Sequence, residues 1–420
     1  MKQLKVLLSA YACNPYKGSE EGVGWGWVKA ISKYHDIYVI TAAYHSEDIE
    51  KAIAEKIMPS SQVKFFYVPH KYWHYKPTRG WKFIENSIFK LIMNYAYRLW
   101  LHDAYKLGQE LHEQYHFDLV HQITYVGFRF PGHLWKLDIP FVWGPIGGLE
   151  NTPWRFIPSL GVTESIYYAG RNILNSFHKR FLSGPKMAFK KAQGGIIAAT
   201  EGIRRGILRW YGVDSEVICE IGPPPEVADS HSLREPGETL KLAWSGLHLQ
   251  GKALPLLLRA LAVLPEGIDW YLDILGQGPY TGKWQRQAKK LGINDRCVWH
   301  GWLPRSEAIA LMHQAHIFVI TSLKDLTSTV LLEALSQGVP VVCPDHCGFS
   351  NVVTEDCGVK VPIESPHQLV SDLSAAIRSL AENEEERRRL AKGALQRIKD
   401  FSWEKKAELV DAIYRRVIKK

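Results

Sequence analysis

Short apolar segments alternate with longer polar stretches along most of the chain. The first apolar segment, residues 4–11, is followed by the turn-forming residues Asn14, Pro15 and Gly18, which is typical of a buried parallel strand. The same pattern predicts strands at residues 36–41, 63–68, 119–121, 141–143 and 195–199, and helices at 22–32 and 81–115. Strands and helices that alternate in this way predict βαβ units in an α/β fold with a doubly wound parallel sheet.

A proline-rich segment interrupts this alternation. Residues 223–225 are three consecutive prolines, which are incompatible with a helix or a central strand. The alternation then restarts, with strands expected at 240–245, 269–275, 298–299, 317–321 and 339–343, and helices from residue 366 onwards. We therefore predict a first domain over residues 1–220, a linker over 221–238 and a second doubly wound domain over 239–400. Two such domains facing each other form a shared cleft, which suits two substrates.

The composition excludes several classes of protein. With 46% apolar and 23% charged residues, the 420-residue chain is not disordered. No apolar run approaches the roughly 20 residues that span a bilayer, and the opening stretch is too short for a signal peptide, so we expect a cytoplasmic protein. The six cysteines are scattered without a zinc-binding pattern, which indicates reduced thiols and no metal site.

The net charge of +9 indicates an acidic partner: a nucleic acid, an anionic membrane or a phosphorylated small molecule. A nucleic acid is not favoured, because the chain contains no recognisable nucleic-acid-binding module. Between residues 71 and 106, lysines and arginines are interleaved with aromatic residues, and a similar bias recurs around residues 171–191. This combination suits the headgroup region of an anionic membrane. The alternative is that the aromatic side chains belong to the core and the cations are merely solvated.

A pair of carboxylates lies close to a predicted helix start in the second domain. A strand ending near Thr321 leads into a polar loop that contains Asp325, and Thr327 or Ser328 can cap the following helix. The free N–H groups of such a first turn bind anions. Glu333 lies within the helix between pairs of apolar residues, an unusual place for an exposed acid.

Lys252 stands just before another predicted helix, which begins near Pro255. A cation at a helix N-terminus is unfavourable by about 0.3–1 kcal/mol unless an anion is also present. Lys252 therefore indicates a phosphate-binding position; the alternative is a solvated surface lysine.

The stretch from Thr321 to Val342 resembles the donor-site motif of the family 4 retaining glycosyltransferases (glycosyl transferases group 1), which have the GT-B fold and two carboxylates separated by seven residues. The first position is usually glutamate in that family and is Asp325 here, whereas Glu333 matches the second. Further segments fall at the family's usual spacing, namely residues 272–279, 291–292, 298–304, 315–318, 338–342, 347–348 and 358–362. The resemblance implies two Rossmann-like domains that face each other across a cleft.

The resemblance also implies roles for individual residues. Glu333 would bind the nucleotide ribose, and Asp325 would hold the transferred sugar. The backbone around Ser328 and Thr329 would receive the distal phosphate, while Lys252 would stabilise the departing diphosphate. In the family an arginine normally stands five positions before this lysine, where this chain has Leu247.

In the amino-terminal half the resemblance is thinner. Gly18 and Ser19 open a glycine-rich loop that in the family approaches the donor phosphate or the acceptor. His121 stands on a strand that often presents a histidine to the reaction centre, but that histidine usually falls two residues later, at Ile123 here. His121 is thus either catalytic or a buried structural residue. Residues 401–420 resemble the family's last helix, which returns to the acceptor-side domain over residues 1–220, whereas 239–400 would bind the nucleotide sugar.

These observations lead to one hypothesis and two alternatives. The chain is expected to move a sugar from a nucleotide-sugar donor to a glycan or lipid-linked glycan acceptor with retention, in surface polysaccharide or lipopolysaccharide biosynthesis at the inner face of the membrane. No cofactor or metal is expected, since the lysine and the helix N-terminus can compensate the negative charge of the diphosphate. The alternatives are a sugar-nucleotide epimerase or phosphorylase of the same fold, and a catalytically degenerate binding protein, because Asp325, Leu247 and Ile123 depart from the pattern.

Overall fold

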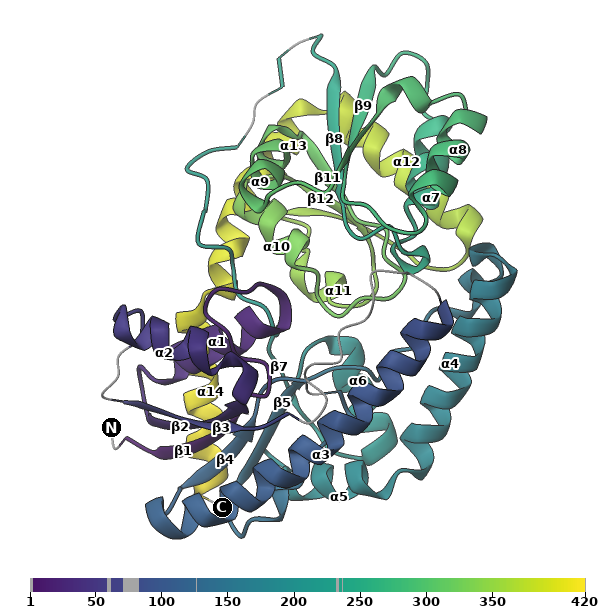
Figure 1. Ribbon diagram of the computed structural model, residues 1–420. Helices are drawn as coiled ribbons and strands as arrows, with labels where there is room; N and C mark the ends of the chain where they lie inside the picture. The colour runs from purple at the N-terminus through teal and green to yellow at the C-terminus, as the bar shows by residue number, and fades with distance from the viewer. Residues whose placement is uncertain are drawn as a thin grey trace.

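The computed structural model describes residues 3–58, 62–70, 83–125, 127–231, 234–235 and 237–419, with only the backbone for 83–91. It contains two parallel sheets, each covered by helices, in two domains that lie one above the other in Figure 1. The fold class predicted from the sequence is confirmed.

The amino-terminal domain is built on a seven-stranded sheet with the order β3-β2-β1-β4-β5-β6-β7. Its strands pair in parallel throughout. They are β1 (Lys5–Ser9), β2 (Asp36–Ala42), β3 (Val63–Val68), β4 (Leu119–Gln122), β5 (Phe141–Ile146), β6 (Ile196–Ala198) and β7 (Glu216–Val217). The strands are mostly buried on both faces, which explains why they are continuous apolar runs in the sequence.

The carboxyl-terminal domain has a six-stranded parallel sheet with the order β10-β9-β8-β11-β12-β13. Its strands are β8 (Leu240–Ser245), β9 (Trp270–Leu275), β10 (Cys297–Gly301), β11 (Ile317–Val319), β12 (Val341–Pro344) and β13 (Gly358–Val361). In both sheets the strand order reverses beside the first strand, and the crevice for a ligand in a doubly wound fold lies at this point.

Helices connect the strands and cover both sheets. The amino-terminal domain contains α1 (Ser19–Ile31), α2 (Ser46–Ala54), α3 (Phe83–Tyr115), α4 (Val162–Phe181), α5 (Ser183–Lys191) and α6 (Glu201–Tyr211). The second domain contains α7 (Leu254–Ala262), α8 (Thr281–Lys290), α9 (Arg305–Gln314), α10 (Thr329–Ser336), α11 (Phe349–Val352), α12 (Pro366–Glu382) and α13 (Glu384–Arg397).

The last helix, α14 (Trp403–Ile418), leaves the carboxyl-terminal domain and packs against α1 of the other domain, as Figure 1 shows in yellow. Val410, Ile413 and Val417 of α14 join the core beneath the first sheet. Trp403 fits against Gly26 and Gly222, where an added Cβ would come within 2.2 Å and 2.3 Å of the indole. These two glycines therefore permit the close approach of the crossing helix.

The sequence pattern missed two short edge strands, β7 and β13, and several helices, namely α2, α4, α5, α6 and α11. The helix α4 buries Asn172, Asn175 and Lys179, while its apolar residues Ile166, Ile173 and Phe177 are more than half exposed. Its pattern is inverted relative to an ordinary surface helix, so the rule that apolar residues mark the inner face does not identify it.

Much of the basic aromatic stretch lies outside the described residues, namely 71–82 and the side chains of 83–91. Within the described part, Tyr97 and Trp100 are buried in the core and Tyr95 is exposed. No helix in the described part of the chain is both long and apolar enough to cross a membrane.

Candidate active site

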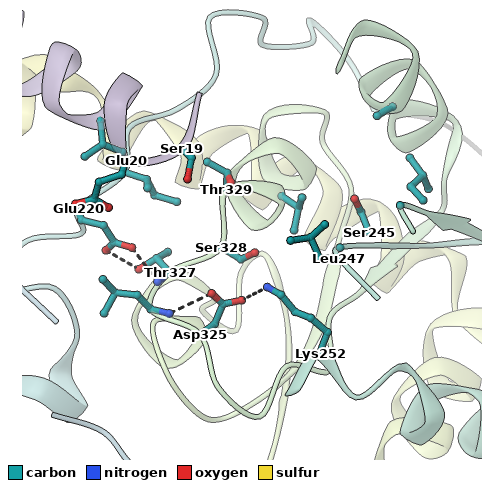
Figure 2. Close-up of a pocket in the computed structure, with 18 of the residues that line it drawn as sticks. Ser19, Glu20, Glu220, Ser245, Leu247, Lys252, Asp325, Thr327, Ser328 and Thr329 are labelled. Atoms are coloured by element: carbon teal, nitrogen blue, oxygen red, sulfur yellow. Dashed lines mark hydrogen bonds and ion pairs between the residues drawn. The ribbon is translucent and has the colours of Figure 1, made fainter. Parts of the chain in front are cut away.

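A cleft of about 620 Å³ lies between the two domains. From the amino-terminal domain it is lined by the start of α1, including Ser19 and Glu20, and by Glu220 after β7. The other wall consists of the segments that follow β8, β9, β10 and β11. Figure 2 shows side chains of both walls directed into this space. The cleft thus collects the carboxyl ends of strands from both sheets.

Asp325 belongs to the loop between β11 and α10. Its Oδ1 accepts a hydrogen bond from the backbone N–H of Leu326 at 3.1 Å, which fixes the carboxylate at the cleft wall. Its own N–H donates to Sγ of Cys347 at 3.4 Å. The predicted carboxylate is therefore held by its own loop and directed into the cleft.

Lys252 ends a short 3-10 helix, η4 (Gln250–Lys252), directly before α7. The following residue, Ala253, has a positive φ of 51°, and Thr321 donates a hydrogen bond to the Lys252 carbonyl oxygen at 2.8 Å. The Lys252 ammonium forms an ion pair with Oδ2 of Asp325, shown as a dashed line in Figure 2. Both side chains are about one-fifth exposed. Two residues that the sequence suggested for different parts of one substrate thus contact each other in the free protein.

The N-terminus of α10 lies beside this ion pair. Ser328 is its N-cap residue, but its side chain makes no capping hydrogen bond. The Ser328 side chain therefore leaves the first N–H groups of the helix uncapped where Ser328 and Thr329 line the cleft. An anion in the cleft can satisfy them.

Glu333 lies one turn further along α10 and lines an adjoining cavity of about 500 Å³. Gly18 lines this cavity, and Ser19 and Thr329 line both it and the main cleft. Burial raises the pKa of the Glu333 carboxyl, and Nε of Arg305 donates to Oε1 of Glu333 at 3.2 Å. The predicted donor-site residues are therefore all brought together at these two connected cavities.

His121 is the exception among the predicted site residues. It is fully buried, its Nε2 donates to the Gly144 carbonyl oxygen at 2.9 Å, and its Nδ1 accepts from the Tyr414 hydroxyl at 2.7 Å. Burial lowers its pKa to about 3, so the ring stays neutral. The prediction that His121 is a catalytic residue at the reaction centre is wrong, because its side chain joins β4 to α14 inside the core and does not line the cleft. Its alternative role as a buried structural residue agrees with these contacts.

The position of the family's arginine is occupied by Leu247, which is exposed at the cleft. His248 does not replace the missing charge, because burial lowers its pKa to about 4 and its Nδ1 is bonded to Thr281 Oγ1 at 2.7 Å. Among the described residues that line the main cleft, Lys252 is therefore the only lysine or arginine.

Glu220 is a cleft residue that the sequence analysis missed. Its two carboxylate oxygens accept from the N–H and the hydroxyl of Thr327 at 2.9 Å and 3.0 Å, and its carbonyl oxygen accepts from Trp27 at 3.0 Å. Burial raises its pKa to about 7. The only sequence signal is one acid within the apolar run Val217–Ile221, before the prolines. Glu220 links the interdomain linker to the loop that carries Asp325.

Solved structures resemble the whole chain. The apo form of the lipopolysaccharide outer core galactosyltransferase WaaB aligns with a TM-score of 0.65, covering 97% of this chain and 99% of that chain at 14% identity. Alr3699/HepE of Anabaena, in complex with UDP-glucose, aligns with a TM-score of 0.57, covering 99% of each chain at 14% identity. At this level of identity the likeness shows the fold, which is the GT-B fold.

Sequence comparison matches part of the chain to a family of enzymes. Residues 229–397 match the family of glycosyl transferases group 1. A D-inositol 3-phosphate glycosyltransferase of Corynebacterium glutamicum is 25% identical over 228 residues, which are 50% of this chain and 54% of that protein. A lipopolysaccharide 1,6-galactosyltransferase of Escherichia coli is 31% identical over 154 residues, which are 36% of this chain and 42% of that protein. The chain thus spans about half the length of these relatives or less. The match to glycosyl transferases group 1 lies within the carboxyl-terminal half of the chain.

The buried contacts of His121 predict a structural phenotype. His121→Ala leaves the Tyr414 hydroxyl and the Gly144 carbonyl without partners, so we expect the free energy of unfolding to fall by about 2–4 kcal/mol. Tyr414→Phe removes one of these bonds and should cost about 1 kcal/mol. Sugar-transfer turnover per folded molecule should stay within about twofold of the parent protein. A folded His121→Ala protein with much lower turnover would contradict this assignment.

The raised pKa of Glu220 predicts a pH-dependent stability. Folding raises this pKa from 4.5 to about 7, so the folded state binds the proton more tightly than the unfolded state. The resulting stabilisation is fully present below about pH 4.5 and is lost as the pH rises through 7. Glu220→Gln removes the titration, so between pH 4.5 and 8 the parent should lose about 3 kcal/mol relative to this variant. Urea denaturation at both pH values measures the free energy of unfolding of the two proteins. If it changes with pH to the same extent in both, Glu220 does not contribute the predicted pH dependence.

Proposed function

We propose that this protein is a retaining glycosyltransferase that moves a sugar from a nucleotide-sugar donor to a glycan or lipid-linked glycan acceptor. The observation that carries the proposal is the Lys252–Asp325 ion pair beside the uncapped N-terminus of α10, in the cleft between the two domains. A cation, a helix N-terminus and a carboxylate at one place suit a diphosphate and a sugar that are joined to each other.

Donor binding would exchange partners in this cluster. The diphosphate is a stronger anion for Lys252 than a single carboxylate, and the N–H groups near Ser328 and Thr329 would add to its binding. Asp325, released from Lys252, would accept hydrogen bonds from the sugar hydroxyls. As the bond to the sugar breaks, Lys252 and the α10 N-terminus would stabilise the charge that develops on the leaving diphosphate. This arrangement uses protein charges only, and we propose that the reaction needs no metal ion.

Glu333 would bind the ribose in the adjoining cavity. Its carboxylate accepts one hydrogen bond from Arg305 and has further lone pairs for two hydroxyl donors. Arg305 also pairs with Glu226 at 3.1 Å, so it can remain bound when Glu333 turns to a ligand. A uridine diphosphate sugar is the first donor to test, because Alr3699/HepE, which shares the fold, binds UDP-glucose.

The acceptor is proposed to belong to surface polysaccharide or lipopolysaccharide biosynthesis, since the relatives include a lipopolysaccharide 1,6-galactosyltransferase. The exposed apolar face of α4 supports contact with a membrane at its cytoplasmic side. This face consists of Val162, Ile166, Ile173, Leu174, Phe177 and Phe181, each between 51% and 81% exposed. Exposed cations on α4 and α5, including Arg180 and Lys186, border it and suit anionic headgroups.

Two substitutions distinguish the roles of Lys252 and Asp325 in the ion pair. Lys252→Ala should weaken UDP binding and lower turnover by about 30- to 1,000-fold, which corresponds to about 2–4 kcal/mol. Asp325→Asn should also abolish most turnover but should not weaken UDP binding, because it removes the carboxylate that competes for Lys252. Calorimetric titration of UDP in EDTA tests both. Equal loss of UDP affinity in the two variants would show that the pair is only a structural support.

The proposed ribose contact predicts a selective loss. Glu333→Gln should weaken UDP binding by at least about 10-fold, since it removes charge-assisted hydrogen bonds, and should leave the binding of inorganic pyrophosphate unchanged. Thermal stabilisation by UDP, GDP, ADP and pyrophosphate without metal measures this. The control is Glu226→Gln, which also loses an Arg305 pair but does not line the cavity. If the parent protein responds to no nucleotide, the degenerate-protein alternative is favoured.

A further inference from the structure

A third space, a cavity of about 330 Å³, adjoins the proposed donor site at Asp325, the residue proposed to hold the sugar. Asp325 and Leu326 line both this cavity and the main cleft. Its other walls come from both domains, with the segment after β5, α4 and α6 on one side and the loops around Lys324 and His346 on the other. Its volume lies within the range of about 300–1,000 Å³ that is usual for ligand pockets. The donor-site motif does not account for this space.

The cavity carries unpaired positive charge. Lys324 and Arg171 line it, and among the described residues neither side chain has a hydrogen bond or an ion pair. Two more cations lie close to them, and within the described part of the chain their hydrogen bonds go to neutral groups. Arg129 donates to Nδ1 of His178 at 2.8 Å and to Asn175, and Lys179 donates to the Leu149 carbonyl oxygen at 2.8 Å.

The carboxylates nearby do not balance these cations. Glu150 lines the cavity and accepts from Thr200 Oγ1 at 3.1 Å; burial raises its pKa, whereas the nearby Lys324 and Lys179 lower it, so this one carboxylate offsets only part of the charge of the four cations. Asp325 is already paired with Lys252. Burial and, to a lesser extent, the nearby Arg171 and Arg129 lower the pKa of Lys324 to about 7, so a bound anion would favour the charged form of this lysine.

Several like charges gathered around a half-buried cavity are unfavourable in the free protein, and an anion that enters the cavity relieves this repulsion. The cavity also contains Nε2 of His346, which is buried and has no hydrogen-bond partner among the described residues. A ligand with acidic oxygens can therefore accept from the lysine and the arginine together, and a hydroxyl of the same ligand can donate to the imidazole.

We propose that this cavity binds an acidic group, a phosphate or a carboxylate, carried by the acceptor glycan. The inference rests on the proposed function and names the chemistry of its second substrate. The acceptor is favoured over the donor because half of the cavity belongs to the amino-terminal domain. In addition, Arg171 is on α4, whose exposed apolar face is the proposed contact with the membrane that would hold a lipid-linked acceptor.

The test uses small sugars with UDP already bound. Calorimetric titration of glucose 6-phosphate, glucuronate and glucose into the UDP-saturated protein should give binding of the two acidic sugars at least about 10-fold tighter than that of glucose. The double variant Lys324→Gln/Arg171→Gln should lose this preference, because each substitution removes a charge-assisted contact, and should keep its UDP affinity and melting temperature. Neither side chain has a hydrogen bond or an ion pair with the described residues, so their replacement breaks no such interaction there.

The matched control is Arg180→Gln/Lys186→Gln, which removes the same charge from exposed positions of α4 and α5 outside the cavity. It should bind the acidic sugars like the parent. Equal loss in both double variants would overturn the proposal in favour of a general field effect, and equal binding of glucose and its phosphate would also overturn it. If the parent prefers UDP-glucuronate to UDP-glucose and only the cavity variant loses this preference, the acidic group belongs to the donor and the acceptor assignment fails.

The two proposals fail in different ways. A protein that does not bind UDP, or that binds it independently of Lys252, contradicts the proposed transferase site. A protein that binds UDP through Lys252 but shows no preference for acidic sugars contradicts only the acidic acceptor.

Discussion

The parallel arrangement of both sheets is the constraint on which the rest of the structure depends. In a parallel sheet all strands end at the same edge, and here the carboxyl-terminal edges of two sheets open into one interdomain cleft. The loops that carry Lys252, Asp325 and Ser19 therefore meet although they are far apart in the sequence. The carboxyl-terminal domain supplies Lys252 and Asp325 and the amino-terminal domain supplies Ser19, so the complete cleft requires the two domains to be held together.

Contacts at three places contribute to holding the domains in this relation. The helix α14 begins beside the second domain and ends in the core of the first, where Tyr414 bonds His121. Glu220 ties the linker to Thr327, two residues after Asp325. At the far side, Tyr280 of the second domain bonds Glu164 at the start of α4. Because the Glu220 hydrogen bonds join the linker directly to the loop that carries Asp325, a movement between the domains would displace this loop.

The charge distribution around Asp325 gives the cleft its chemical character. On one side Asp325 neutralises Lys252, and on the other it borders the cavity where Lys324 and Arg171 have no hydrogen bond or ion pair with the described residues. The free protein thus holds one cation in an internal ion pair and leaves two for an incoming anion. With Leu247 in place of the family's arginine and His248 neutral, Lys252 is the only cation at the main cleft in the described structure. A donor diphosphate would then depend heavily on this lysine and on the α10 N-terminus.

The sequence by itself determined the two doubly wound domains and the donor loop, because strand periodicity, the prolines at 223–225 and the spacing of Asp325 and Glu333 are local features. It did not reveal α4, whose polar residues Asn172 and Asn175 face inward. Only the tertiary structure decided that His121 is a core residue, that Lys252 pairs with Asp325 and that Glu220 bonds Thr327. These contacts join residues 293, 73 and 107 positions apart. Burial and charge pairing at such separations arise from the packing of whole elements, and a pattern of neighbouring residues does not encode them.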